Sequence, residues 1–342
     1  MGTHFLFPAH PLRPIAVEEM FADQLEAARG AGYTASLCPD SVIQGGKPLR
    51  NVPQGATVVY RGWMLKSAEY ERLPAAVAAA SASPLTPTDG YLAAHHLPNW
   101  YPLVVEFTPE TRVLAREADW ESELRSLGWE AFFVKDYVKS LKTSRGSIVR
   151  DPAELGAVVS EMEQFRGEIE GGLCVRRVEP FVAESERRYF VLDRRAFSAD
   201  GQPVPDLVGQ VAERIPSPFF SVDVIRREDG VLRLVEVGDG QVSEASAVGA
   251  GRDQADVRRG AGGVGTLTGA EQIRSTAAQT TPDPTSPVKR VPYPSRGRCR
   301  AGVTSTAEPR IERIRRCAAG PAWAGGGVTV VASLSAGSRG DV

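Results

Sequence analysis

Two carboxylates on neighbouring strand patterns are the residues of this sequence best suited to bind a metal ion. Asp223 lies in SVDVIRR and Glu236 in VLRLVEV, and the dipeptide Asp229-Gly230 separates the two patterns. Asp-Gly between β-branched runs predicts a hairpin with a two-residue turn. Counting outward from the centre of that turn places Asp223 directly opposite Glu236.

Opposed residues on antiparallel strands have Cβ atoms about 4.5–5.5 Å apart, and like charges repel there. The hairpin is rich in valine, leucine and isoleucine, so its carboxylates need a compensating cation. Mg²⁺ would supply it, because this ion is held by one or two carboxylates together with substrate phosphates. An arginine or lysine that neutralises the pair is the alternative, and the hairpin alone does not decide between them.

A lysine at the end of a second strand pattern points to an anion site. Lys135 ends AFFVK, and the loop 136–147 that follows contains Lys139, Lys142 and Gly146. Ammonium groups and loop N–H groups can both reach a phosphate. A solvated run of charges is the alternative for this loop.

An acidic connector lies between two further strand patterns, 173–182 and 187–193. Pro180 lacks a backbone donor, so the first strand is expected to end there and to leave backbone groups for a ligand. The acidic side chains of this region, each taken singly an exposed residue, are Glu179, Glu184 and Glu186.

The N-terminal part alternates strand and helix patterns. Strands are expected at 4–7, 33–37 and 56–60, and helices at 17–29 and 67–80. Ser67 is expected to cap the second helix. This alternation predicts a small α/β domain with a mostly parallel sheet.

The middle of the chain predicts a helix over 91–102, a short strand within 107–114 and a helix over 151–165, and a turn-rich stretch precedes the hairpin. His95 and His96 are adjacent, so on a helix they point in different directions. We therefore expect packing or surface histidines rather than a metal pair.

Composition excludes several classes of protein. Up to residue 247 there are 26 Lys and Arg against 35 Asp and Glu, and no basic run with interleaved aromatics, so no nucleic acid partner is expected. The four cysteines lack metal-site or disulfide spacing, and no membrane segment or secretion signal is evident, so a cytoplasmic protein is expected. From Val248 onward no apolar period is found, which predicts a disordered tail.

Three features now stand in order: a strand-end lysine with a basic loop, an acidic connector, and a hairpin with opposed carboxylates. Together with the stretches at 59–65, 95–103, 108–111 and 236–243, they resemble the ATP-grasp superfamily, specifically its Arg-to-Lys clade of small proteins. The resemblance covers roughly residues 5–243 and implies an α/β (α+β) fold. The expected domains are an N-terminal α/β domain at 1–90, a two-lobed ATP-grasp domain at 91–247 with lobes of about 100–172 and 173–247, and the disordered tail at 248–342.

The resemblance also implies the nucleotide contacts. Lys135 would contact the phosphates of ATP, under a mobile flap formed by 136–147. Glu186 would hold the ribose hydroxyls, with Glu184 as the less favoured substitute. Backbone groups of a hinge would read adenine, at Glu179, Pro180, Phe181 and Val182.

Asp223 and Glu236 match the two Mg²⁺ carboxylates of the family. Its third ligand is usually an asparagine two residues after the glutamate, where this chain has Gly238, and Gln241 is the nearest candidate. The arginine usual two residues before the aspartate is replaced here by Ser221. Lys142, with Lys139 as second choice, is expected to supply that positive charge, and Arg188 and Arg61 are candidates for substrate binding.

The implied activity is ligation of a carboxylate to an amine or thiol through an acyl phosphate, with ATP and Mg²⁺ as cofactors. The expected substrates are small molecules or peptides. The alternative is a non-catalytic ATP-binding module with the same fold.

Overall fold

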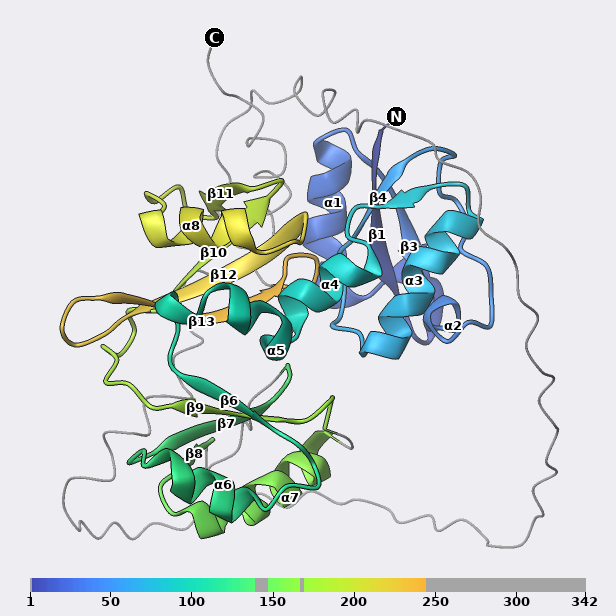
Figure 1. Cartoon of the computed structure of the whole chain (residues 1–342). Helices are drawn as coiled ribbons and strands as arrows, with labels where there is room; N and C mark the ends of the chain where they lie inside the picture. Colours follow the sequence, from blue (N-terminus) through green and yellow to red (C-terminus); the bar gives the residue numbers. More distant parts are fainter. Residues whose placement is uncertain (1, 139–146, 167–168, 244–342) are drawn as a thin grey trace, which may run out of the picture.

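A computed structural model describes residues 2–138, 147–166 and 169–243 of the chain (Figure 1). Over these ranges the strands form three separate sheets. One belongs to the N-terminal domain, one to a first lobe and one to a second lobe, which carries the hairpin. Lys139, Lys142 and the tail predicted from residue 248 lie outside the described residues.

The N-terminal domain is built around β1, whose residues Phe5, Leu6 and Phe7 are fully buried. Strands β3, β4 and β5 extend its sheet in parallel and β2 pairs antiparallel, as the mostly parallel prediction requires. The strands are β1 Thr3–His10, β2 Arg13–Val17, β3 Thr34–Cys38, β4 Thr57–Tyr60 and β5 Ser83–Pro84. Both faces are covered by helices: η1 Glu19–Phe21, α1 Ala22–Gly30, α2 Asp40–Ile43 and α3 Ser67–Ala79.

Two local predictions in this domain were wrong. The first helix begins at Ala22 rather than Val17, because Val17 pairs with Ala9 as part of β2. Ser67 is not a cap: Lys66 occupies the N-cap of α3, and its N–H donates to Glu69. The hydroxyl of Ser67 is thereby left for a contact with the first lobe.

A helical linker connects the N-terminal domain to the first lobe. The single helix predicted over 91–102 is broken at His96, whose backbone is extended. Pro98 explains the break, because it lacks the N–H that would continue the helix. The resulting segments are α4 Thr88–His95, α5 Leu97–Trp100, η2 Tyr101–Leu103 and η3 Val105–Phe107.

The first lobe is an antiparallel sheet in the order β6-β9-β7-β8 with helices packed on one face (Figure 1, bottom). Its strands are β6 Thr111–Leu114, β7 Phe132–Asp136, β8 Ile148–Val149 and β9 Leu173–Arg177. Its helices are α6 Trp120–Leu127, which the sequence reading missed, η4 Pro152–Glu154 and α7 Leu155–Arg166. Because β9 pairs with β6 and β7, strand pairing places the crossing between the lobes after Arg177, a few residues beyond the expected boundary at 172.

The second lobe is the antiparallel sheet β11-β10-β12-β13, covered by α8. Its elements are β10 Arg187–Leu192, β11 Arg195–Ser198, α8 Asp206–Arg214, β12 Phe219–Arg226 and β13 Leu232–Asp239. The stretch before the hairpin was predicted as turns, so β11 and α8 were missed. Val208, Val211 and Ala212 of α8 are buried against this sheet, at the i, i+3 and i+4 spacing typical of an amphipathic helix.

The hairpin β12–β13 pairs Asp223 with Glu236 as predicted, but not through the predicted turn. Arg227 N–H donates to the carbonyl of Val231, which leaves a three-residue loop at 228–230 with Gly230 at φ +90°. That loop shifts the register by one residue, and a bulge beside Asp223 shifts it back. The two deviations cancel at the carboxylates.

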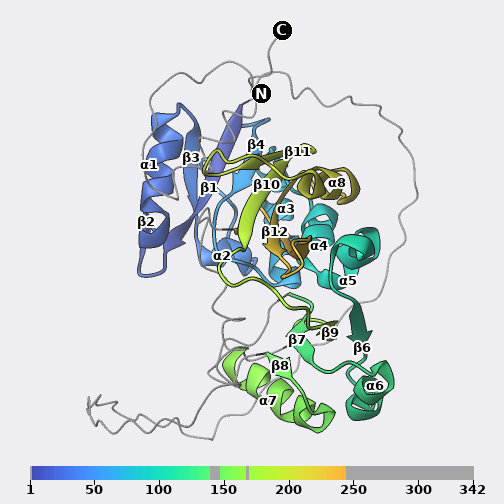
Figure 2. The same ribbon diagram turned by 90° about the vertical axis from the view of Figure 1, so that its left-hand side faces the viewer.

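The N-terminal domain and the second lobe lie side by side, and the first lobe lies below them (Figure 2). Helix α4 bridges the upper pair by packing against β13. In the described part of the chain, no helix is both long and apolar enough to span a bilayer.

Candidate functional site

A row of charged side chains crosses the sheet of the second lobe. Arg188 on β10 is paired with Asp223 on β12, and Asp223 with Glu236 on β13. Directly opposed residues share a face of a sheet, so all three side chains project from one face. The guanidinium of Arg188 donates from Nε to Oδ1 of Asp223 at 2.7 Å and from Nη2 to Oδ2 at 2.6 Å.

The second carboxylate is met by a lysine from the first lobe. Nζ of Lys135, at the end of β7, donates to Oε1 of Glu236 at 3.0 Å. The Lys135 side chain is 6% exposed, whereas that of Glu236 is 37% exposed. Each carboxylate therefore has a cation of its own, and Glu236 keeps a face open to solvent.

The ion pair with Asp223 governs the charge of Arg188. Burial by itself would lower the pKa of Arg188, but the hydrogen bonds and the charge of Asp223 outweigh it and raise that pKa. Arg188 is therefore a permanent cation on the site face of the sheet.

The donor set fits a hard divalent cation. Within residues 2–138, 147–166 and 169–243 no group of three or more His, Cys, Asp or Glu side chains could hold a metal by itself. Two opposed carboxylates supply the one or two protein oxygens that Mg²⁺ takes when phosphate oxygens complete its shell. The residues present are those expected of a site that binds the metal together with a nucleotide.

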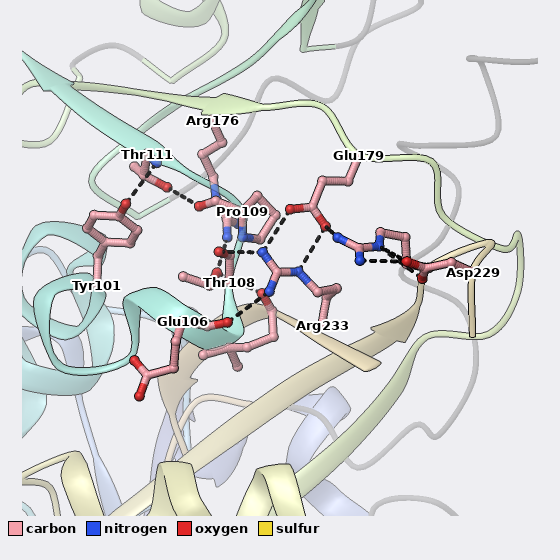
Figure 3. Close-up of polar contacts among 11 residues, drawn as sticks. Tyr101, Glu106, Thr108, Pro109, Thr111, Arg176, Glu179, Asp229 and Arg233 are labelled. Carbon is pink, nitrogen blue, oxygen red and sulfur yellow. Dashed lines mark hydrogen bonds and ion pairs between the residues drawn. The ribbon is translucent and has the colours of Figure 1, made fainter. Parts of the chain in front are cut away.

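The hinge expected at 179–182 joins the lobes, but its glutamate does not face a ligand (Figure 3). The carboxylate of Glu179 accepts from Nε of Arg233 at 2.9 Å and from Nη2 at 2.8 Å. Arg227 lies 3.5 Å from the same carboxylate. Glu179 thus ties the hinge to the hairpin through its side chain.

Two backbone groups of the hinge are also used by the hairpin. The carbonyl of Pro180 accepts from Glu228 N–H at 2.9 Å, and Val182 N–H donates to Arg226 at 2.8 Å. These bonds flank an antiparallel bridge between Phe181 and Arg227. In such a bridge the N–H and C=O of the central residue point away from the partner strand, so those of Phe181 are turned away from the hairpin.

The two ribose candidates differ in position. Glu186 lies two residues before Arg188, is half-buried, and its charge acts on Arg188. Glu184 is exposed, with φ +60° in a turn, and its carbonyl accepts from Arg187. The structure therefore brings Glu186, and not Glu184, next to the row of charged side chains.

Gln241 lies apart from the carboxylate pair, at the contact with the N-terminal domain. Its amide oxygen accepts from Tyr60 N–H at 3.2 Å, and its amide nitrogen donates to the hydroxyl of Tyr70 at 2.7 Å. Arg61 lies at the same contact, where it donates to the carbonyls of Gly240, Gln241 and Ser243. Both side chains join the N-terminal domain to the end of β13.

Ser221 occupies the position where the resemblance leads one to expect an arginine. It is buried, and its hydroxyl lies 2.8 Å from that of Ser243. Its side chain brings no positive charge to this position of the sheet.

The sequence reading missed a buried cation beside the site. Arg176 on β9 lies on the same sheet face as Lys135, because Phe133 pairs with Arg176 and Lys135 pairs with Cys174. Its guanidinium donates to the carbonyl of Val235 at 2.5 Å and packs over the ring of Trp100 at 5.8 Å. Alternation within LCVRR places Arg176 on the same face as Cys174, a signal that was available in the sequence.

A second missed cluster joins the first lobe to α3. Oε1 of Glu170 accepts from the N–H and the hydroxyl of Ser67, at 2.9 and 2.5 Å, and lies 3.5 Å from Nε2 of His96. Burial favours the neutral acid, but the hydrogen bonds from His96 and Ser67 outweigh it and lower the pKa of Glu170 to about 2. His96 therefore serves a contact between domains.

Comparison with known proteins identifies the region around these residues. Residues 99–258 match the sequence family described as the ATP-grasp domain of the Arg-to-Lys clade, family 3. A search of curated proteins finds no match.

Among solved structures, D-cycloserine synthetase DcsG is similar at a TM-score of 0.51 and 15% identity, over 76% of this chain and 99% of that one. The RimK domain protein ATP-grasp from Sphaerobacter thermophilus gives a TM-score of 0.48 at 16% identity, over 75% and 95% of the two chains. D-alanine–D-alanine ligase from Bacillus anthracis gives 0.46 at 11% identity, over 75% and 92%. The first of these likenesses shows a shared mixed α/β fold.

Proposed function

Because residues 99–258 form an ATP-grasp domain of the Arg-to-Lys clade, we propose that this chain is an ATP- and Mg²⁺-dependent ligase that joins a carboxylate to an amine or a thiol. The observation that supports it is the opposed pair Asp223 and Glu236, faced across the lobes by Lys135. Carboxylates for a metal and a lysine for phosphates meet there in one place.

The nucleotide would lie between the two lobes. Lys135 would exchange Glu236 for a phosphate oxygen, since an ammonium group can reorient among nearby anions. Phe181 offers the hinge N–H and C=O that are turned away from the hairpin, and these would read adenine. Glu186 is the better placed carboxylate for the ribose hydroxyls.

Asp223 and Glu236 would hold Mg²⁺, which when bound offsets the negative charge on the phosphoryl group in transfer. Glu236 is the more accessible of the two ligands. Gln241 is not needed in this proposal, because its amide is bonded to Tyr60 and Tyr70.

The reaction would have two steps. A carboxylate oxygen of the substrate attacks the γ-phosphorus, and the bond to ADP breaks. The amine or thiol then attacks the acyl carbon, phosphate leaves, and the nucleophile loses its proton. Arg188 stands on the site face as a cation for these steps. Lys142, and next Lys139, stay the proposed source of the charge that Ser221 cannot provide, and both lie outside the described residues.

A screen of amino acids and short peptides for ADP release tests the activity. We expect ADP only when a carboxylate, an amine or thiol, ATP and Mg²⁺ are all present. Omission of each component in turn is the control. ATP binding without turnover across the whole screen would contradict a ligase.

A non-catalytic ATP-binding module is the second candidate. It is favoured by the buried bidentate pair of Asp223 with Arg188, which must loosen before Asp223 can serve a metal. The same screen separates the two functions.

A cytoplasmic location suits both candidates. Cys38 and Cys174 are free thiols, and burial raises the pKa of each to about 12. Such thiols are unreactive and need no oxidising compartment.

A further inference from the structure

The opposition of Asp223 and Glu236 depends on one extra residue in β13. On the turn side of the bulge, Val224 faces Leu234, and beyond it Asp223 faces Glu236, so Val235 is the extra residue between two paired ones. Without the bulge, Asp223 would face Val235, and Glu236 would turn to the core face of the sheet. The bulge is therefore what creates the carboxylate pair.

A bulge interrupts the ladder and leaves backbone groups that need other partners. Here the first lobe supplies them. The hydroxyl of Thr108 donates to the carbonyl of Leu234 at 2.7 Å, and Nη1 of Arg176 donates to that of Val235 at 2.5 Å. Nη2 of Arg176 also donates to the Thr108 hydroxyl, which joins the two contacts (Figure 3).

Arg176 is an expensive residue to place there, because its guanidinium is buried and only 5% of the residue is exposed. Burial lowers its pKa to about 10, so it remains charged at neutral pH. Its Nε has no hydrogen-bond partner among the described residues. A packing role alone would be met by an apolar side chain without this cost.

We propose that Arg176 is a positioning residue for the metal site: with Thr108 it holds the bulge of β13 and so keeps Glu236 opposite Asp223. This deepens the proposed function and rests on it for the role of the metal. The guanidinium is required for its fixed pair of donors, because Val235 and Thr108 are contacted at the same time.

Disulfide trapping in the full chain tests the geometry without nucleotide. The pair Val222→Cys with Val237→Cys is opposed only when the bulge is present, whereas Val224→Cys with Leu234→Cys lies on the turn side and is opposed either way. Opposed strand residues lie within the reach of a disulfide. In Arg176→Met, we expect the yield of the first cross-link to fall at least fivefold and that of the second to stay unchanged, with mass spectrometry identifying the linked peptides.

Magnesium titration tests the consequence. With saturating ATP, Arg176→Met should raise the Mg²⁺ concentration that gives half of the thermal stabilisation about tenfold, while ATP affinity in EDTA changes less than threefold. Thr108→Val, a nearly isosteric change, should raise it about threefold. Arg176→Lys keeps the charge but not the paired donors, and should resemble Arg176→Met.

Arg233→Met is the matched control, because Arg233 also joins the lobes but donates to Glu179 and to the carbonyls of Glu106 and Thr108 rather than to the bulge. It should leave both cross-link yields unchanged. Unchanged cross-linking in Arg176→Met and Thr108→Val, or wild-type magnesium dependence in Arg176→Lys, would overturn the inference. If the wild type shows no Mg²⁺-ATP stabilisation, the proposed function fails instead, and the cross-link yields still decide the role of Arg176.

Discussion

The two carboxylates of the site are neutralised in different ways. Asp223 is 3% exposed and forms two hydrogen bonds with Arg188 on the adjacent strand of its own sheet. Glu236 is 37% exposed and forms one with Lys135, which belongs to the other lobe. One pair is internal to the second lobe, and the other exists only while the lobes are together.

This difference assigns the two halves different tasks. A buried bidentate pair between neighbouring strands is fixed by the sheet, so Asp223 and Arg188 form a scaffold. A partly exposed pair between lobes is weaker and easier to exchange. We therefore expect Glu236 and Lys135 to change partners when a nucleotide binds, and Asp223 to change little.

The largest effect is expected on stability. Asp223→Ala leaves the Arg188 guanidinium buried without its partner and should lower the free energy of unfolding by about 3–5 kcal/mol. Glu236→Gln should lower it by less than about 1 kcal/mol. Urea unfolding of the free protein measures both.

The control replaces the whole pair, as Asp223→Leu with Arg188→Met, which should recover most of the loss because no charge is left unpaired. The repulsion between carboxylates inferred from the hairpin alone predicts the reverse, a gain in stability when they are removed. Equal losses for Asp223→Ala and Glu236→Gln would contradict the comparison.

The next effect concerns the lysines. Lys135→Ala should mainly weaken ATP binding, because this side chain would contact the phosphates in the ground state. Lys142→Ala should keep ATP affinity within a few-fold and lower the rate of ADP release about a hundredfold, since a charge needed in the transition state is lost.

Lys139→Ala is the companion variant, expected to have the smaller effect on rate. If both Lys142→Ala and Lys139→Ala turn over like the wild type, then Arg188 becomes the candidate for the cation that Ser221 does not supply.

Ligand binding should show the same asymmetry. Mg²⁺-ATP at one hundred times its dissociation constant should stabilise the protein by about 2.7 kcal/mol. Glu236→Gln should abolish the part of this gain that depends on magnesium while barely changing the free protein. A melting shift that is unchanged in Glu236→Gln would remove this carboxylate from the metal site.

The smallest effect concerns Glu170, the other carboxylate that joins the lobes to the rest of the molecule. Its pKa is about 2 in the folded protein against an ordinary 4.5, so its contribution is complete above pH 4.5 and is lost as the pH falls toward 2. Glu170→Gln, which keeps an acceptor for Ser67, should lower the melting temperature at pH 7 by about 2–4 °C.

Melting curves of the wild type and of Glu170→Gln between pH 7 and pH 2 provide the check. The two curves should converge at low pH, and a constant difference across the range would show that the charge of Glu170 does not matter.

Local patterns in the sequence determined much of the fold. The alternation in the N-terminal part, the strand ending in Lys135 and the hairpin were all found, because apolar period and turn residues act over a few neighbours. Helix α8 was missed although its apolar stripe is present, since the glycine and prolines around it outweighed that signal.

The pairing of Asp223 with Glu236 was predicted from a turn that the chain does not use, and it survived because the loop and the bulge offset each other. Tertiary contacts decided the rest. The partners of Glu236, Glu179, Gln241 and Glu170 come from segments 54 to 181 residues away along the chain. A side chain's partner across such a distance is set by how the lobes pack, which no local pattern encodes. That is why the sequence could supply the residues of the site, while only the folded chain shows which carboxylate is a fixed support and which is open to a ligand.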